Sequence, residues 1–344
     1  MIRYFLQLGL LLCVSAGALV AQTEPPAPPA KPAPKAKVEV VDKTKPPGTP
    51  RFARDERFTS ERAIPADPSV AVKLCISEGA VKINGWERNE VRVFVRNGRK
   101  FEFRSLEKNP ETGKANWIWI ANQAAGVTMN GPMSNCLAGD SVEIDMPMSA
   151  SVGLEARTSG AVIDSVKKAN VKVIEGSIAL RNIPGGVSAE AFQGDVMIES
   201  SAGQISLQTT TGNILAFDVK PGSVGDLLKA KTNSGAISLQ SVNHRQIEAN
   251  SISGTVSFNG KFLPGGLYNF KTSNGSVRML LPQDTSCKMQ ASYGFGNFDS
   301  AIPFTLETEN LIPGGKSIVA KFGNGDANVT VTTSSGSIGI RKQN

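Results

Sequence analysis

The sequence predicts an all-β protein, a right-handed parallel β-solenoid of short two-strand units preceded by an N-terminal β-hairpin region. The first observation is the stretch TNSGAISLQ, in which apolar Ile237 and Leu239 stand two and four residues after Gly235, separated by a small polar residue. The same offsets follow other glycines: Gly79, Gly176, Gly194, Gly203, Gly254, Gly275 and Gly336.

A second alternating run precedes many of these glycines. Leu228 and Ala230 stand seven and five residues before Gly235, and equivalent pairs precede Gly254, Gly275 and Gly336. Alternation with a period of two is typical of half-buried strands, and a glycine between two such runs marks a tight bend. One unit is therefore strand, glycine corner, strand.

The spacing of the corners is the third observation. Glycines 160, 176, 194, 212, 235, 254 and 275 follow one another at intervals of 16 to 23 residues, and only the units of Gly160 and Gly212 depart from the apolar pattern. Such a period is typical of repeat architectures, in which each unit buries its apolar face by stacking on its neighbours. The handedness rule for parallel crossovers predicts a right-handed solenoid.

The repeat register predicts which side chains face the core. Six residues should point into one continuous core: Ile237, Leu239, Val256, Phe258, Val277 and Met279. The positions predicted to point outward are mostly Ser, Thr and Gln: Thr232, Ser234, Ser238, Gln240, Thr255, Ser257 and Ser276. This composition suits a solvated sheet face that carries ladders of small polar side chains.

The chain divides into three predicted segments. Residues 1–21 combine Arg3, an apolar run and small residues at its end, which predicts an exported protein, periplasmic or on the cell surface, with a signal peptide. An uncleaved signal anchor is the alternative, and it is the one predicted route to membrane contact. Residues 22–57 are rich in Pro, Ala and Lys and predict a disordered linker, so that 58–344 form the solenoid domain.

The N-terminal hairpin is predicted within residues 90–104, which form two alternating runs around Asn97 and Gly98. A loop of Arg96, Asn97 and Gly98 would place Gly98 at a left-handed bulge position. The cross-strand pairs would then be Val93 with Phe101, Val91 with Phe103, Arg92 with Glu102 and Glu90 with Arg104.

Histidine and cysteine, which are common in catalytic and zinc sites, are scarce in this sequence. The single histidine, His244, lies in SVNHRQIE and is predicted to be an exposed loop residue without a catalytic role. No Cys/His cluster has zinc spacing, and GNGDAN at 323–328 is predicted to be a turn. We therefore predict no catalytic, cofactor-binding or metal-binding residues, and no enzyme. The net charge of +7 leaves about three positive charges on the folded region, which does not favour nucleic acid as a partner.

The cysteines are assigned from the register. Val72 and Leu74 lie an odd number of residues before Gly79 and should point inward, so Cys75 should point outward. An outward thiol in an exported protein is expected to pair, and Cys136 in SNCLAG is free to reach it. We predict a Cys75–Cys136 disulfide, whereas Cys287 should be a buried free thiol.

The segments KLCISEGAVKINGWERNEVRV, VEIDMPMSASVGLEARTSG and LPQDTSCKMQASYGFGNFDS, with the successive TSNG and TNSG corners, resemble the bacterial DUF4097/DUF4098 "putative adhesin" family, which is related to the toastrack and GIN domains. The resemblance covers roughly 70–342. It implies an extracytoplasmic β-helix-like domain with an adhesive or envelope-scaffold role, and it brings no catalytic motif.

Three functions of different class follow. The favoured one is a non-enzymatic extracytoplasmic interaction or scaffold protein of the bacterial envelope, whose partner is an envelope polysaccharide, the cell wall or a surface protein. The alternatives are a polysaccharide-acting β-helix enzyme, either a lyase or a hydrolase, and a sensor module in envelope-stress signalling. The Ser, Thr and Gln at the outward positions favour binding over catalysis, because β-helix enzymes gather acidic and basic side chains on neighbouring rungs.

Overall fold

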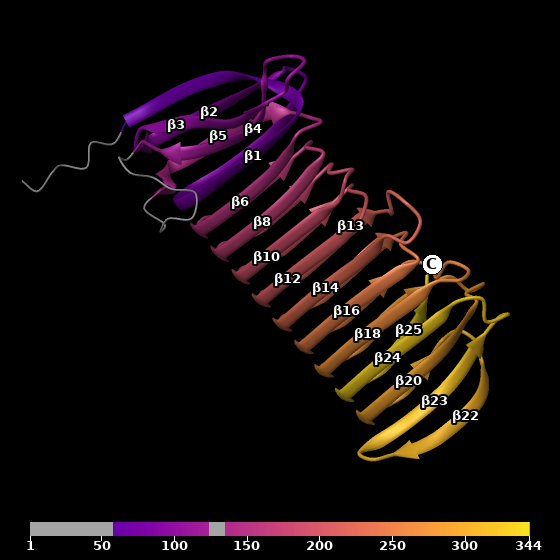
Figure 1. Ribbon diagram of the computed structural model, residues 1–344. Helices are drawn as coiled ribbons and strands as arrows, with labels where there is room; N and C mark the ends of the chain where they lie inside the picture. The colour runs from indigo at the N-terminus through magenta and orange to yellow at the C-terminus, as the bar shows by residue number, and fades with distance from the viewer. Residues whose placement is uncertain (1–57, 124–134, 344) are drawn as a thin grey trace, which may run out of the picture. The chain divides into compact units, whose positions relative to one another are not determined.

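The computed structural model describes residues 58–123 and 135–343, and every named element in these ranges is a β-strand (Figure 1). They belong to one structural unit, Asp55–Asn344. The predicted signal peptide at 1–21 and linker at 22–57 lie outside the described residues. The all-β solenoid prediction is confirmed, and its right-handedness stays a prediction.

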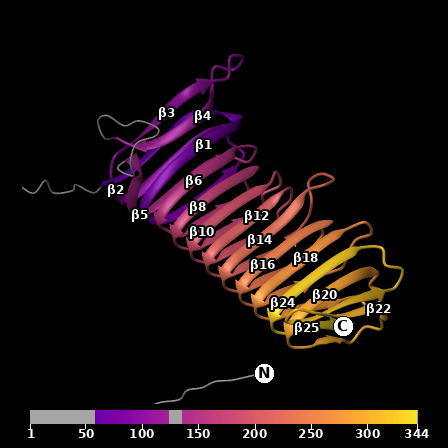
Figure 2. The ribbon, with the colours of Figure 1, turned by 60° about the horizontal axis from the view of Figure 1, so that its bottom comes forward.

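Each repeat contributes two strands that flank a glycine corner, and like strands of successive repeats pair in parallel (Figures 1 and 2). We call the two stacks the first sheet and the second sheet. The repeats of the first sheet are β6 (Ser151–Thr158), β8 (Lys168–Glu175), β10 (Val187–Gln193), β12 (Ile205–Thr211), β14 (Leu227–Ser234), β16 (Gln246–Ser253) and β18 (Leu267–Asn274). Those of the second sheet are β7 (Ala161–Asp164), β9 (Ile178–Arg181), β11 (Val196–Glu199), β13 (Ile214–Val219), β15 (Ile237–Val242), β17 (Val256–Asn259) and β19 (Val277–Leu281).

The register stacks equivalent side chains. Ile237 pairs with Ile214 on one side and Val256 on the other, so apolar residues form continuous columns between the sheets. All six residues predicted to face the core are at most 2% exposed, which confirms the inward pattern.

The corner glycines also form a column. Gly235 has φ = +152°, and a Cβ there would overlap the carbonyl oxygen of Gly212 in the preceding repeat. Both the left-handed backbone and the close approach of neighbouring corners therefore require glycine.

The prediction that Thr232 points outward is wrong, because its side chain is fully buried. Three residues before the corner glycine, a threonine or serine faces inward in five repeats: Thr209, Thr232, Ser251, Thr272 and Thr333. A buried hydroxyl needs a hydrogen-bond partner, and each of these donates to the carbonyl of a neighbouring corner glycine.

The first repeat is formed by the long strand β1 (Phe58–Trp86), which spans both sheets and pairs in parallel with β6 and β7. Three more strands extend the stack at this end: β2 (Glu90–Gly98), β4 (Ala115–Asn122) and β5 (Leu137–Pro147). The strand β3 (Phe101–Lys108) pairs with β4 in an antiparallel hairpin.

An N-terminal hairpin therefore exists, but the predicted pairing of 90–93 with 101–104 is wrong. Both edges of β2 are occupied, since Val93 pairs with Arg62 of β1 and with Ile144 of β5. Phe101 and Phe103 pair instead with Asn122 and Ile120. The left-handed residue is Asn97, with φ = +47°, and a Cβ at Gly98 would overlap the backbone of Ala138.

At the C-terminal end the chain order and the stacking order differ. The strands are β20 (Cys287–Phe295), β21 (Phe298–Ser300), β22 (Thr305–Ile312), β23 (Gly315–Phe322), β24 (Asn328–Ser335) and β25 (Ile338–Lys342). The last two fill the place between β18 and β20 and between β19 and β21 (Figure 1). The segment 323–328 is the turn that leads into β24, as predicted.

The cysteine predictions are confirmed. Cys75 and Cys136 form a disulfide with a Cα–Cα distance of 4.5 Å, and Val72 and Leu74 are buried on the inner side of the same strand. Cys287 is a buried free thiol, and burial raises its pKa to about 12. A thiol with that pKa is not a nucleophile near neutral pH.

Candidate binding surface

A groove of about 540 Å³ lies on the outer face of the second sheet, over β15, β17, β19, β25 and β21. Its outward-facing lining residues are Ser238, Gln240, Ser257, Asn259, Ser276, Arg278, Leu280, Asn297, Asp299, Ser337, Gly339 and Arg341. Four of these residues, Ser238, Gln240, Ser257 and Ser276, are among those that the sequence predicts to point outward. The aromatic ring of Phe258 lies beneath the groove in the core, where it is 1% exposed.

The strand register sorts these side chains into two rows that cross the strands. The first row runs Ser238, Ser257, Arg278, Gly339, Asp299, and the second runs Gln240, Asn259, Leu280, Arg341. Since paired strands are about 4.8 Å apart, each row repeats with that spacing along the stack. The groove therefore presents hydrogen-bonding groups at regular intervals in the direction in which the repeats succeed one another.

Several of the polar groups already have partners. Gln240 Nε2 donates to Ser238 Oγ at 3.2 Å, and Gln343 Nε2 donates to Asn259 Oδ1 at 2.8 Å. At the far end, Arg341 Nη2 and Asp299 Oδ2 form an ion pair at 2.8 Å. These contacts fix the walls of the groove.

The centre of the first row is different. The side chains of Ser257 and Arg278 make no hydrogen bond or ion pair with any residue of the described ranges. Next to Arg278 stands Gly339, and a Cβ built there would have no atom within 4 Å. A free guanidinium, a free hydroxyl and an uncovered stretch of backbone thus lie side by side.

Several charged residues elsewhere on the solenoid pair along the stack. Lys172 and Glu190 approach to 3.8 Å, and Lys229 and Glu248 to 3.9 Å, on the first sheet. On the second sheet Arg181 and Glu199 approach to 3.3 Å. Such exposed pairs contribute little to stability, and within each pair the two charges neutralise each other.

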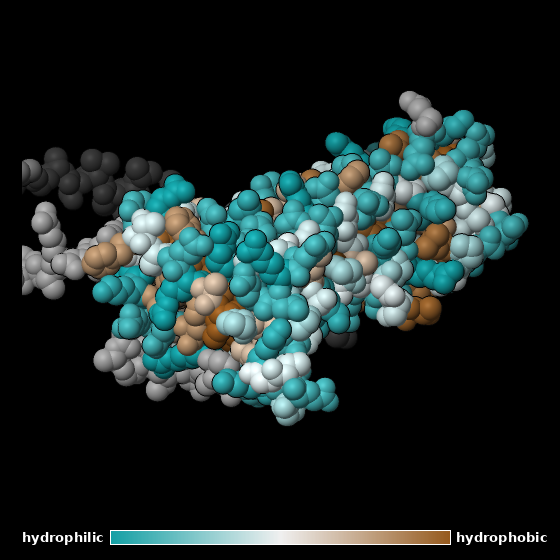
Figure 3. All heavy atoms as spheres, turned by 90° about the horizontal axis from the view of Figure 1, so that it is seen from above, coloured by the Kyte–Doolittle hydropathy of each residue, from teal (hydrophilic) through white to brown (hydrophobic). Residues whose placement is uncertain are grey.

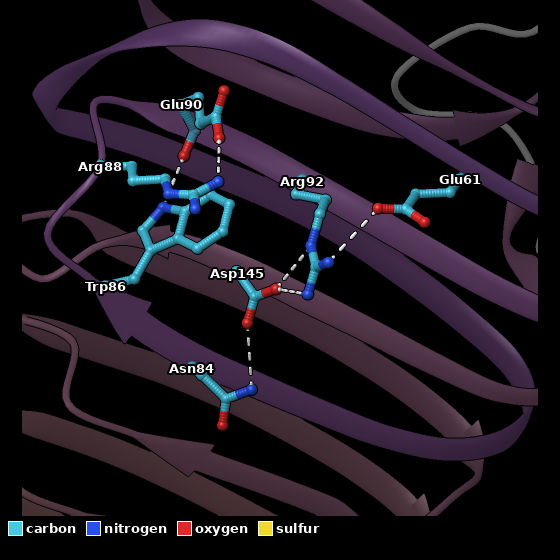
Figure 4. A network of polar contacts seen from close by, with 7 residues as sticks. All are labelled: Glu61, Asn84, Trp86, Arg88, Glu90, Arg92 and Asp145. Carbon is cyan, nitrogen blue, oxygen red and sulfur yellow. Dashed lines mark hydrogen bonds and ion pairs between the residues drawn. The ribbon is translucent and has the colours of Figure 1, made fainter.

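The other large polar cluster lies at the N-terminal end and is shown in Figure 4. Arg92 donates Nε to Asp145 Oδ2 at 2.8 Å and Nη1 to Glu61 at 3.3 Å, and Asn84 donates to Asp145 Oδ1 at 3.2 Å. Hydrogen bonding to Asp145 raises the pKa of Arg92 above its ordinary value. These contacts tie β1, β2 and β5 together.

Trp86 belongs to the same cluster. The guanidinium carbons of Arg88 and Arg92 lie 5.1 and 5.5 Å from its ring centroid, within cation–π range, and its Nε1 donates to Glu90 O at 2.9 Å (Figure 4). The charged groups contact one another, and the indole of Trp86 contacts Arg88, Arg92 and Glu90. We therefore interpret the cluster as one that stabilises the first repeats.

The prediction that His244 is exposed is wrong. Its side chain is fully buried, and Nε2 lies 2.9 Å from the carbonyl oxygen of Gly203, which precedes β12. Burial lowers its pKa below the ordinary value of 6.5, and Nδ1 has no partner among the described residues. Tyr268 Oη also donates to the backbone carbonyl of His244 at 3.3 Å. The alternation rule could not place His244, because the residue lies in the turn between two repeats.

Sequence reasoning missed the centre of the groove. Arg278 and Gly339 each stand three residues after a corner glycine, at the position held by Ser238 and Ser257 in other repeats. Gly339 was the signal in the sequence that could have indicated the groove. It stands at an outward position of a strand, where neither a bend nor a close approach of the backbone requires glycine.

Across 58–123 and 135–343, no three His, Cys, Asp or Glu side chains gather as a metal site would require. The same ranges hold no helix long and apolar enough to cross a membrane. In the view of Figure 3 the surface is largely hydrophilic, and the apolar side chains form small separate groups.

Comparisons with known proteins gave a family match and matches to solved structures. The model of the Toastrack DUF4097 family matches residues 80–341. Two solved structures resemble the chain: a "putative cell adhesion protein" from Clostridium sporogenes ATCC 15579, and a "putative adhesin" from Bacteroides fragilis NCTC 9343. The first is 12% identical with a TM-score of 0.20 and covers 83% of this chain and 100% of its own. The second is 9% identical with a TM-score of 0.35 and covers 84% and 99%. None of the curated proteins matches the chain.

Proposed function

The chain belongs to the Toastrack DUF4097 family, and from this premise we propose that it is a non-enzymatic, exported interaction protein whose groove on the second sheet binds an envelope polysaccharide. The observation that carries the proposal is the pair of polar rows across β15, β17, β19, β25 and β21. A linear polymer with repeating hydroxyl groups can lie along rows of side chains that themselves repeat at a constant interval.

The chemistry of the lining supports a sugar ligand over a protein ligand. Serine hydroxyls and the amides of Gln240 and Asn259 can both donate and accept hydrogen bonds, as sugar hydroxyls can. The core of a protein interface usually has large apolar or aromatic anchors. The groove exposes no aromatic side chain, and Leu280, at 36% exposure, is its one large exposed aliphatic residue.

The same lining argues against hydrolysis. Glycoside hydrolysis generally needs two carboxyl groups on opposite sides of the scissile bond. Asp299 is the single carboxylate among the lining residues, and it is engaged by Arg341. Residues that hold a polymer without cleaving it fit an adhesive or scaffold role.

Export is supported by the disulfide. Disulfides persist in oxidising compartments and are rare where thiols are kept reduced. The disulfide between Cys75 and Cys136 joins the first repeat to the segment that precedes β5. The folded protein therefore contains two cysteines in the oxidised state. A periplasmic or cell-surface location follows from the proposal.

The test is binding of the full chain to an array of purified linear polysaccharides, with Ser257→Val as the probe variant. Valine suits a strand but removes the free hydroxyl at the centre of the groove. Ser188→Val, at an exposed position of the first sheet, is the matched control. We expect wild type and Ser188→Val to bind the same polymers and Ser257→Val to bind them several-fold more weakly. Equal binding by all three proteins would contradict the placement of the site.

A further inference from the structure

We infer that the polysaccharide held in the groove is anionic and that Arg278 binds its carboxylate, with Gly339 left without a side chain to make room for it. The inference rests on the proposed function, because it names the chemical class of the ligand at the same site. It depends on three features of the first row, which concern charge, partners and shape.

The first feature is the charge of the groove. Arg278, Arg341 and Asp299 are its charged lining residues, and Arg341 is neutralised by Asp299 at 2.8 Å. One positive charge remains, on Arg278. The planar guanidinium presents donors in a fork that matches the two oxygens of a carboxylate.

The second feature is that Arg278 has no competing partner. Its row neighbours are Ser257 on one side and Gly339 on the other, and neither carries a charge. Asp299 lies beyond Gly339, two strands away, which corresponds to roughly 10 Å. An arginine that faces such a surface without a carboxylate partner is available to a carboxylate from outside.

The third feature is Gly339 itself. Its φ is not in the left-handed region, and a Cβ there would meet no atom within 4 Å. Neither the backbone conformation nor the packing requires glycine, and glycine in a strand interior is unfavourable for stability. The consequence of having glycine here is an open floor between Arg278 and Asp299, where a ligand group can approach the backbone.

The experiment compares charged and neutral polymers that share a backbone. The pairs are polygalacturonate and its methyl ester, hyaluronan and its methyl ester, and carboxymethyl cellulose and hydroxyethyl cellulose. Binding to the full chain is measured at low ionic strength, where charge contributes most. We expect at least one anionic polymer to bind about tenfold more tightly than its neutral counterpart.

Variants test whether Arg278 is responsible for the preference for anionic polymers. Arg278→Gln should abolish it, and Arg278→Lys should keep part of it, since lysine retains the charge but loses the fork. Lys271→Gln removes a positive charge from the first sheet and should change nothing. Gly339→Thr should weaken binding of charged and neutral polymers alike without lowering the thermal midpoint, because threonine fills the floor and suits a strand.

Two results would overturn the inference while leaving the proposed function intact: equal binding of charged and neutral polymers by wild type, or an anionic preference that survives Arg278→Gln. Failure of wild type to bind any of the six polymers or any member of the wider array would overturn the proposed function itself.

Discussion

The hydroxyl of Thr232 donates a hydrogen bond of 3.0 Å to the carbonyl oxygen of Gly212, one repeat earlier in the solenoid. The same bond recurs from Thr209 to Gly194, Ser251 to Gly235, Thr272 to Gly254 and Thr333 to Gly275. The corner carbonyl points at the next repeat, so the buried hydroxyl provides its partner. A ladder of hydrogen bonds from buried hydroxyls therefore joins successive corners, where the glycines themselves have no side chain to form such bonds.

We expect Thr232→Val to lower the free energy of unfolding by about 1 to 2 kcal/mol, because the change keeps the side-chain volume but leaves a buried carbonyl without that donor. The measurement is a denaturant melt of wild type and variant under the same conditions. Thr232→Ser, which retains the hydroxyl, is the control and should lose less than Thr232→Val. If valine and serine cost the same, the hydrogen bond is not the reason for threonine at this position.

The corner glycines and Gly339 should respond in opposite ways to a single methyl group. Gly235→Ala places a Cβ against the carbonyl of Gly212 and forces alanine to φ = +152°, so we expect a loss of about 2 kcal/mol or more. Gly339→Ala meets no atom within 4 Å and should not lower the denaturation midpoint. Comparable losses in both variants would mean that the corner geometry is not what requires glycine.

The contrast between Gly235 and Gly339 also shows what the sequence can and cannot predict. The corner, the inward residues Ile237 and Leu239 and the parallel stacking are local consequences of a repeated pattern, and the structure confirms them. The prediction for Thr232 fails because it follows the polarity of the side chain, whereas the odd offset of Thr232 from Gly235 is that of the inward residues. At this position the polarity of the side chain predicts exposure and the strand register predicts burial, and the structure follows the register.

Pairing between distant strands was less predictable. Val93 and Phe101 alternate correctly for a hairpin, yet each strand finds its partners elsewhere, because β1 and β5 occupy both edges of β2. Likewise nothing local distinguishes the Gly336 unit from its predecessors, although its strands insert between β18 and β20. The groove depends on this insertion, since Gly339 lies beside Arg278 only because β25 pairs with β19.

The Cys75–Cys136 bridge should contribute substantially to stability. It closes a loop with a sequence separation of 61 residues, for which the chain-entropy model gives about 4 kcal/mol. Reduction should therefore lower the denaturant midpoint of wild type. The double variant Cys75→Ser/Cys136→Ser should have a low midpoint that reductant no longer changes. A wild-type midpoint unaffected by reduction would show that the bridge does not stabilise the fold, provided that thiol titration confirms it was opened.

The buried His244 predicts a loss of stability in mild acid. Nε2–H donates to Gly203 O, so the neutral ring leaves Nδ1 as an acceptor, and protonation would add a buried donor without a partner. Burial accordingly lowers the pKa of His244 in the folded protein below 6.5, the ordinary value that applies to the unfolded chain. Below pH 6.5 the unfolded state then binds more protons than the folded state. The free energy of unfolding therefore decreases as the pH is lowered.

A second group near His244 titrates in a separate window. Backbone hydrogen bonds from Ser223 and Gly222 lower the pKa of Asp226 below 3.8, so its contribution is lost only under more acidic conditions. We therefore expect the denaturation midpoint of wild type to fall between about pH 6.5 and 4.5. His244→Gln, whose amide can still donate to Gly203 O, should show a smaller fall over the same range. An identical pH dependence in both proteins would mean that other groups, and not His244, link folding to protons in this window.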